Sequence, residues 1–224
     1  MVRALGIVLF LAKYGRSELA FYGAVWTALG LAAFKVCPPA TAVPVAGLAF
    51  TAYFFRDPRR AVPEGEHNVV SPADGRVTDV TELRLPEFGD VLMVRIGIFL
   101  SVLDVHVNRA PCAGEVRAIR YTPGKFHSAF AADAGDVNEA NAIRMATSAG
   151  DILVRQVAGL IARRIVCDLG EGQKVERGQR IGMIKFGSRT EVYLPKDRVA
   201  DVCVAVGQKV RGAATVVARF KEAA

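Results

Sequence analysis

The chain has 224 residues, enough for one substantial domain or for one domain with an appendage. Its formal net charge of +7 and mean hydropathy of +0.27 favour an anionic membrane surface as a partner. Zinc-finger spacing and RNA-binding aromatic motifs are absent, which argues against a nucleic-acid partner. Four scattered cysteines and three histidines predict reduced thiols in the cytoplasm and no metal centre.

Two uncharged apolar runs, 19–34 and 36–55, lie near the N-terminus and are separated by Lys35. Each is near the lower length limit for a helix that spans a bilayer. The positive-inside rule places both ends in the cytoplasm and predicts a helical hairpin at the cytoplasmic side of the cell membrane. The basic flanking residues are Arg3, Lys13, Arg16, Arg56, Arg59 and Arg60.

Three prolines weaken the second apolar run, which is therefore expected to be kinked or re-entrant: Pro38, Pro39 and Pro44. A buried apolar hairpin in a soluble protein, or a hairpin that lies at the membrane interface, is the alternative. Residues 1–60 are assigned to this membrane-associating hairpin.

Residues 61–224 are predicted to form a mainly β (α+β) domain, because short β-rich runs alternate with Gly, Pro and Asp. The segment 169–186 resembles 204–220, and both contain GQKV followed by a glycine and apolar alternation. The segment 71–80 has the shape of a further strand-turn-strand corner. Such glycine-turn repeats are typical of barrel-sandwich folds, including biotinyl and lipoyl carriers.

The dipeptide Gly187-Ser188, in KFGSRT, indicates on its own an ordinary turn. A serine hydroxyl can also attack the preceding carbonyl when a base takes its proton and donors hold the oxyanion. Elimination from the resulting ester breaks the chain, and hydrolysis of the dehydroalanine leaves a pyruvoyl group. Such a ketone is an electron sink for amine substrates. The dipeptide alone leaves both interpretations open.

Two further segments carry candidate residues. SPADG (71–75) contains Asp74, which by itself indicates a turn aspartate that binds nearby backbone. YTPGKFHSAF (121–130) places Phe126 and His127 in an apolar, ionisable loop that suits the lining of a pocket.

DVHVNRAP (104–111) is a third segment of interest, and it offers Asp104, His106, Asn108 and Arg109. In a strand, positions 104, 106 and 108 share one face. A lone histidine in a strand is more often structural than catalytic.

In this order and spacing, SPADG, DVHVNRAP, PGKF and FGSR resemble phosphatidylserine decarboxylase. FFRDPRR after an apolar hairpin is similar to the short, membrane-attached form of that family. The resemblance covers roughly residues 50–200. It implies a carboxy-lyase that converts phosphatidylserine to phosphatidylethanolamine and is made as a self-cleaving proenzyme.

The resemblance also implies the position of cleavage, between Gly187 and Ser188, which yields a β chain of 1–187 and an α chain of 188–224. Ser188 becomes a covalent pyruvoyl cofactor, whose ketone forms a Schiff base with the serine amine of the lipid. No metal or added cofactor is implied.

Site residues follow from the same resemblance. Asp74 matches an aspartate implicated in self-cleavage within an Asp-His-Ser arrangement. His106 matches the first histidine of an H-x-x-H motif, and Arg109 stands where longer members keep the second. His106 is therefore expected to serve both self-cleavage and protonation of the carbanion, unless His127 supplies one of them. Expected substrate contacts are His127, Phe126, Asn108 and Arg109.

The expected partners are a phospholipid substrate, the membrane surface and a second copy in a homodimer of cleaved protomers. Three alternatives remain: the same chemistry on archaetidylserine or another serine-headed lipid, a non-catalytic lipoyl- or biotinyl-like binding module, and a small membrane-anchored protein. The sequence lacks the Met-Lys-Met or Asp-Lys-Ala turn that a carrier module needs.

Overall fold

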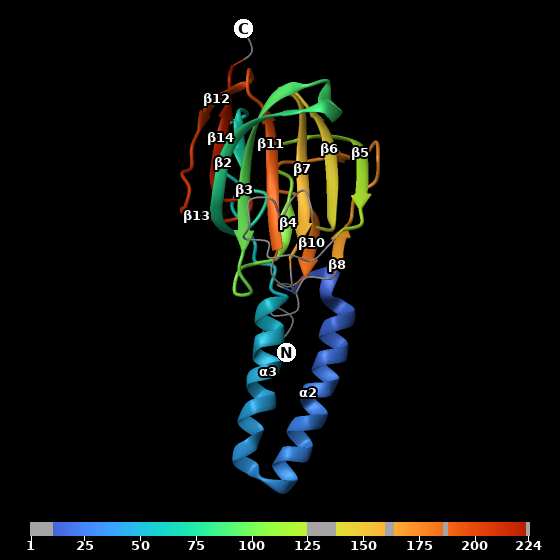
Figure 1. Cartoon of the computed structure of the whole chain (residues 1–224). Helices are drawn as coiled ribbons and strands as arrows, with labels where there is room; N and C mark the ends of the chain where they lie inside the picture. Colours follow the sequence, from blue (N-terminus) through green and yellow to red (C-terminus); the bar gives the residue numbers. More distant parts are fainter. Residues whose placement is uncertain (1–10, 125–137, 160–163, 186–187, 223–224) are drawn as a thin grey trace. The chain divides into compact units, whose positions relative to one another are not determined.

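The computed structural model describes residues 11–124, 138–159, 164–185 and 188–222 (Figure 1). The chain divides into two compact units, Met1–Arg59 and Arg60–Ala224. The expectation of a mainly β fold preceded by N-terminal helices is confirmed.

From residue 11 onward, the first unit contains two α-helices, α2 (Arg16–Val36) and α3 (Ala42–Phe54), each preceded by a 3-10 turn, η1 (Lys13–Gly15) and η2 (Pro38–Thr41). Within the described residues, one helical stretch, Lys13–Val36, is long and apolar enough to cross a membrane, and none of its apolar window is buried. α3 has 13 residues, so it rises only about 20 Å, which is short of a bilayer core of about 30 Å.

The second apolar run is thus interrupted, as its prolines predict. Pro38 and Pro39 lie in η2 because proline lacks the N–H that an α-helical interior needs. After α2, the chain therefore becomes α-helical again only at Ala42. Lys35, between the two apolar runs, belongs to the last turn of α2 rather than to the connection.

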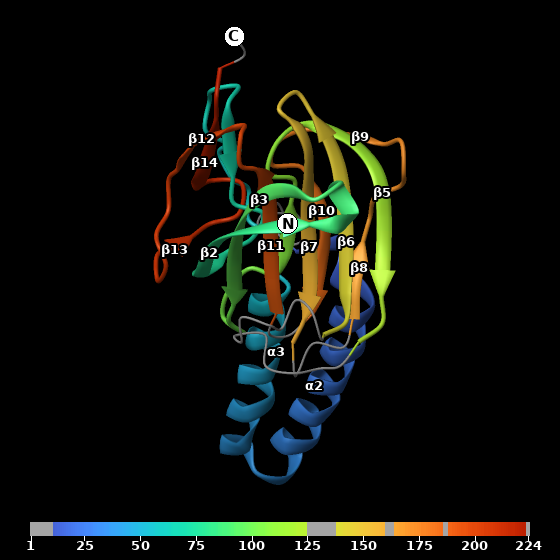
Figure 2. The same ribbon diagram turned by 45° about the horizontal axis from the view of Figure 1, so that its top comes forward.

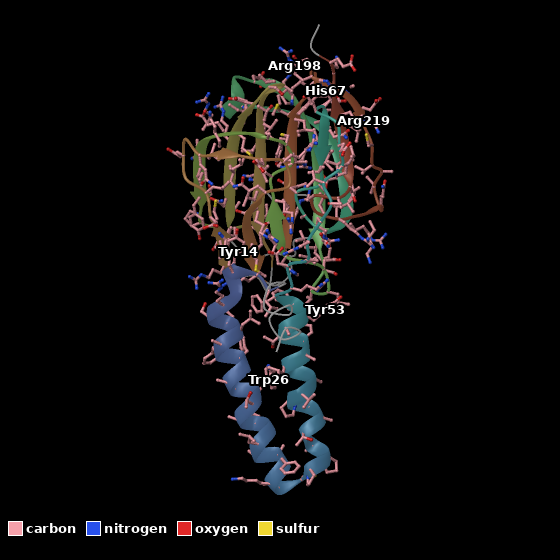
Figure 3. All side chains as sticks on the ribbon, turned by 180° about the vertical axis from the view of Figure 1, so that it is seen from behind. Tyr14, Trp26, Tyr53, His67, Arg198 and Arg219 are labelled. Carbon is pink, nitrogen blue, oxygen red and sulfur yellow. The ribbon has the colours of Figure 1, made fainter. Side chains whose placement is uncertain are left out.

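A small residue allows α2 and α3 to approach each other. A Cβ at Gly47 would lie 2.5 Å from the Trp26 ring, so only glycine fits beneath it. Trp26 Nε1 donates to Thr51 Oγ1 over 3.2 Å, and Trp26 lies between the two helices (Figure 3). Close packing over a small residue and an interhelical hydrogen bond are features that hold helix pairs together in lipid.

The described strands of the second unit form three antiparallel sheets. The large sheet has the spatial order β13-β2-β3-β11-β7-β6-β5-β9, with bounds Lys209–Val210, Gly75–Leu85, Val91–Leu100, Ser188–Pro195, Gly150–Ala158, Ala140–Thr147, Gly114–Thr122 and Lys174–Val175. A 3-10 turn, η3 (Pro86–Phe88), connects β2 to β3. Figure 1 shows β3, β11, β7 and β6 side by side.

Each of the two smaller sheets has three strands. One has the order β4-β10-β8, with bounds Val107–Arg109, Arg180–Lys185 and Arg164–Cys167. The other has the order β1-β14-β12, with bounds Asn68–Val70, Val216–Phe220 and Val199–Val202.

The predicted GQKV repeats have equivalent structures at the two edges of the large sheet. Gly172 and Gly207 both adopt positive φ, 79° and 88°, which favours glycine at these turns. The glutamine that follows each glycine accepts a hydrogen bond from the backbone three residues earlier. The first repeat then forms edge strand β9 against β5, and the second forms edge strand β13 against β2.

The two faces of the large sheet are buried in different ways. The inner face carries the main apolar core, to which β3, β7 and β11 contribute alternate residues such as Ile98, Val154 and Val192. On the outer face, Tyr193 packs with Met93 and Leu153 under side chains of the β2–β3 hairpin. Figure 2 shows this hairpin crossing in front of the neighbouring strands.

An ionic network also lies on the outer face. Arg189, which is fully buried, donates to Glu191 over 2.7 Å and to Asp79. Asp79 also accepts from Arg95 over 3.0 Å. The Arg189–Asp79 pair passes over Gly97, where a Cβ would lie 2.2 Å from Arg189 Nη2. A bulkier residue at position 97 would therefore break the pair.

The charge state of Asp79 depends on this network. Burial raises the pKa of Asp79, but the charge of Arg189 and hydrogen bonds from Arg189 and Thr78 outweigh burial and hold the pKa below its ordinary value. Because the pKa is lowered in the folded state, the resulting stability is present above the unfolded pKa of about 3.9. It is lost as the pH falls through the folded value.

We predict that Asp79→Asn lowers the melting temperature by about 10 °C at neutral pH, because it leaves part of a buried ion-pair network uncompensated. Thermal unfolding from pH 7 to pH 3 should show a smaller acid destabilisation in the variant than in the wild type. Glu82→Gln is the matched control on the same strand, since Glu82 pairs with Lys196 at the exposed surface and should contribute under about 1 kcal/mol. Equal shifts in both variants would contradict the prediction.

Candidate active site

Ser188 is the first residue of β11 and lies between the ends of two neighbouring strands. It pairs with Leu100 of β3 on one side and with Ala158 of β7 on the other. Its side chain is fully buried, and Oγ has no hydrogen-bond partner among the residues that the structure describes. A buried hydroxyl without a partner costs free energy. Such unpaired groups are therefore unusual outside functional sites.

The hydroxyl belongs to the inner face of the large sheet. Alternation along β11 places Ser188 and Thr190 on the same face as Val192, which is part of the main core. The small sheet covers this region, because Ile184 of β10 packs against Ala158. Ser188 thus lies beneath the small sheet, next to Ala158.

His106 immediately precedes β4 in the small sheet and is fully buried. Its backbone carbonyl accepts from Ile184 N over 3.3 Å, which extends the pairing of β4 with β10. Its Nδ1 lies 2.9 Å from the backbone oxygen of Asp104. A carbonyl oxygen only accepts, so Nδ1 carries the proton, and Nε2 has the lone pair in the neutral ring.

The register of the two sheets aligns His106 with Ser188. Gly182 of β10 lies next to Gln156 of β7, and Ile184 packs against Ala158, so β10 runs in the same direction as β7. β4 is antiparallel to β10 and β11 is antiparallel to β7, so β4 and β11 run in the same direction. Asn108 Nδ2 donates to Thr190 Oγ1 over 3.1 Å, which brings these two inward-facing residues together. Two residues earlier on each segment, the same alternation brings His106 to the level of Ser188.

Asp74 lies at the same end of the large sheet. Its Oδ2 accepts from Arg60 over 2.7 Å, and its Oδ1 accepts from Gly212 N over 2.8 Å. Arg76 of β2 and Arg189 of β11 both pair with the same residue of β3. Since neighbouring strands are about 4.8 Å apart, the backbones of Asp74 and Ser188 lie on the order of 10 Å apart.

A comparison within the chain shows that the turn itself does not require Asp74. SPADGRV leads into β2 and APCAGEV leads into β5, and their glycines, Gly75 and Gly114, both begin a strand close to a backbone carbonyl. The second copy has Ala113 where the first has Asp74. The carboxylate is therefore available for a role other than forming the turn.

The remaining expected residues differ in position. Arg109 points to the opposite side of β4 from Asn108, and its guanidinium donates to Gly178 O over 3.2 Å. Asn108 is fully buried, and both ends of its amide are bonded to protein side chains. Asp104 lies in a turn, where it accepts from Ser101, rather than in the strand. The expected residues outside the described part of the chain are Phe126, His127 and Gly187.

Three residues beside the site were not predicted: Gln156, Thr190 and Arg60 as the partner of Asp74. The first two are inward-facing polar residues in otherwise apolar alternating strands, a signal that the sequence contains. The third has no local signal, because Arg60 and Asp74 are brought together only by the fold.

The arrangement has the parts for attack by a hydroxyl: a desolvated serine oxygen, an imidazole whose Nε2 has a lone pair, and a nearby carboxylate. Other chemistry has less support. The described residues contain no group of three His, Cys, Asp or Glu side chains that could hold a metal. Burial raises the pKa of the Cys112 thiol to about 12, so it is protonated and a poor nucleophile.

Comparisons with known proteins agree with this chemistry. A family model described as phosphatidylserine decarboxylase matches residues 48–218. The phosphatidylserine decarboxylase proenzyme of Carboxydothermus hydrogenoformans is 48% identical over 172 residues, which are 77% of this chain and 80% of the relative. That of Desulfotalea psychrophila is 42% identical over 200 residues, which are 86% and 92% of the two chains. The chain therefore belongs to the phosphatidylserine decarboxylase family and is a carboxy-lyase of phospholipid biosynthesis.

Proposed function

We propose that the protein decarboxylates phosphatidylserine to phosphatidylethanolamine after it cleaves itself between Gly187 and Ser188. The observation that carries this proposal is the fully buried Ser188 Oγ, which lacks a hydrogen-bond partner among the described residues and is aligned with His106. The relatives whose printed names are phosphatidylserine decarboxylase proenzyme support both the substrate and the cleavage.

Self-cleavage begins when Ser188 Oγ attacks the carbonyl carbon of residue 187. The C–N bond breaks, an ester forms, and the amine of Ser188 takes a proton. Removal of the Ser188 Cα proton then expels the carboxylate of residue 187 and leaves dehydroalanine at the new N-terminus. Water converts dehydroalanine to a pyruvoyl group and releases ammonia.

His106 is the proposed base in this sequence. Its Nδ1–H is held by the Asp104 carbonyl, so Nε2 is the atom that accepts the proton from Ser188 Oγ. Burial excludes water from the hydroxyl and favours intramolecular attack over hydrolysis. After cleavage, we propose, the protonated imidazole returns a proton to the substrate carbon.

The same residues fit a pyruvoyl group at position 188. A ketone there supplies an electron sink that permits an amine substrate to lose CO2. β11 keeps the new N-terminus in the sheet through its pairing with β3 and β7. His106 faces this position from the small sheet.

Asp74 is proposed to act electrostatically at the same end of the sheet. Its bonds to Arg60 and to Gly212 N hold the carboxylate in one orientation. A carboxylate held in one orientation stabilises an imidazolium better than one that rotates freely.

The lipid substrate requires access to a membrane, and we propose that the first unit supplies it. Large apolar side chains of α2 are exposed, among them Phe21, Leu29 and Leu31. The basic residues that flank the hairpin suit the cytoplasmic side of the cell membrane. A homodimer of cleaved protomers is the proposed assembly.

We predict that the wild-type protein yields two chains on a denaturing gel, the smaller running from residue 188 to residue 224 with a blocked N-terminus. Intact mass should show the pyruvoyl group on that chain. Ser188→Ala should remain one chain without activity, because it lacks the attacking oxygen. Recovery of an active, uncleaved wild-type chain would exclude the proposal. An assay with phosphatidylserine and archaetidylserine separates the two candidate substrates.

We predict that His106→Ala slows self-cleavage at least a hundredfold, because the variant lacks the proposed base for the Ser188 hydroxyl. The measurement is the fraction of cleaved chain against time after synthesis. His67→Ala is the matched control, since His67 lines a cavity with Arg198 at the end of β11 that lies opposite Ser188 (Figure 3). A normal cleavage rate in the His106 variant would remove it as the base.

We predict that Leu29→Glu combined with Leu31→Glu moves the protein from the membrane fraction to the soluble fraction, because two charges in an apolar helix oppose insertion. Both positions are exposed, at 50% and 63%. Self-cleavage should continue, since the second unit contains the proposed machinery. Leu103→Glu, at an equally exposed position in the second unit, is the control. Retention of the double variant in carbonate-washed membranes would contradict the prediction.

A further inference from the structure

A chain of four buried polar side chains connects the large sheet to the small one. Asn141 Nδ2 donates to Gln156 Oε1 over 3.0 Å, and Gln156 Nε2 donates to Asn108 Oδ1 over 2.9 Å. Asn108 Nδ2 in turn donates to Thr190 Oγ1 over 3.1 Å. Asn108, Gln156 and Thr190 are fully buried, and Asn141 is nearly so.

Three of these residues form one row of the large sheet. Asn141, Gln156 and Thr190 are paired neighbours on β6, β7 and β11. Asn108 comes from the facing sheet and bridges two of them, accepting from Gln156 and donating to Thr190. Its amide thus has both a donor and an acceptor in use, which sets its position along two strands at once.

The next row toward the end of the sheet contains Ser188 and Ala158, paired on β11 and β7. Because strand side chains repeat every two residues, Ser188 lies directly beyond Thr190, and His106 lies directly beyond Asn108. The polar chain is therefore one row away from the proposed nucleophile and its base.

Apolar packing alone does not define this alignment. Hydrophobic burial is non-directional, and a shift of one residue in β4 would turn His106 to the other face of its sheet. A buried amide tolerates no such shift, because each unsatisfied donor or acceptor carries its full desolvation cost. The bonds to Asn108 supply the directional element between the two sheets.

The fold admits the bridge through a glycine on β10. A Cβ at Gly182 would lie 2.0 Å from the backbone oxygen of Val166 and 3.1 Å from Gln156 Nε2. Gly182 also pairs with Asn108 in the β4–β10 ladder. The absence of a side chain there allows the amide of Gln156 to reach the small sheet.

We propose that Gln156 is a positioning residue for self-cleavage: through Asn108 and Thr190, it keeps His106 opposite Ser188. This inference rests on the proposed function. Gln156 acts without touching the reacting atoms, so its removal changes the rate of cleavage rather than its site.

The test compares self-cleavage rates with melting temperatures, the latter measured in a Ser188→Ala background in which the chain stays intact. Gln156→Leu and Thr190→Val each remove one side of the bridge, and each should slow cleavage at least tenfold. Thr190→Ser keeps the hydroxyl and should restore the rate to within about threefold of the wild type.

The matched control is a variant that destabilises the core but keeps the hydrogen bonds of Asn108 to Gln156 and Thr190. Ile152→Ala creates a cavity on the inner face of β7, the strand that carries Gln156. It should lower the melting temperature at least as much as Gln156→Leu, yet cleave within about threefold of the wild-type rate. If Gln156→Leu does not fold, the pair Thr190→Val and Thr190→Ser carries the comparison.

The outcomes separate this inference from the proposed function. A wild-type chain that is not cleaved before Ser188 overturns the proposed function. Cleavage of wild type together with wild-type rates in Gln156→Leu and Thr190→Val overturns only the positioning role. Equal slowing in Ile152→Ala, or no recovery in Thr190→Ser, also overturns it, because the effect would then follow stability rather than the bridge.

Discussion

The packing of the small β4-β10-β8 sheet onto the inner face of the large sheet is the constraint on which the candidate site depends. Ser188 and His106 belong to different sheets, and neither is brought to the other by a hydrogen-bonded ladder. The contact between Asn108 and Thr190 links the sheets one row away. Burial of Ser188 beneath the small sheet follows from the same packing, and so does the desolvation of its hydroxyl.

The near-repetition within the second unit shows that a carboxylate can be added to a structural turn. The two GQKV segments close opposite edges of the large sheet with the same turn. The turns that lead into β2 and β5 are also alike, yet only the first carries an aspartate, Asp74, in place of Ala113. The fold thus needs the glycine and the proline of this corner, and the carboxylate is an addition that Arg60 and Gly212 hold in place.

The outer face of β11 serves stability in a different way from its inner face. Arg189 and Glu191 alternate with Ser188 and Thr190, so one short strand carries an ionic network on one side and the candidate site on the other. The network ties β11 to β2 through Asp79. The strand that begins with Ser188 is thereby restrained from the face opposite the candidate site.

The sequence by itself determined the element types and the family. Alternating apolar residues specify strands, prolines end the apolar helix at Cys37, and repeated Gly-Gln pairs specify turns, because these signals depend only on local backbone preferences. SPADG, DVHVNRAP and FGSR were sufficient to indicate the family.

The tertiary structure alone decided which residues meet. Gln156, Asn108 and Thr190 are 34 to 82 residues apart in the chain, and no local preference encodes a hydrogen bond across two packed sheets. Their alignment depends on strand order and register, which arise from burial of the whole core rather than from any single segment.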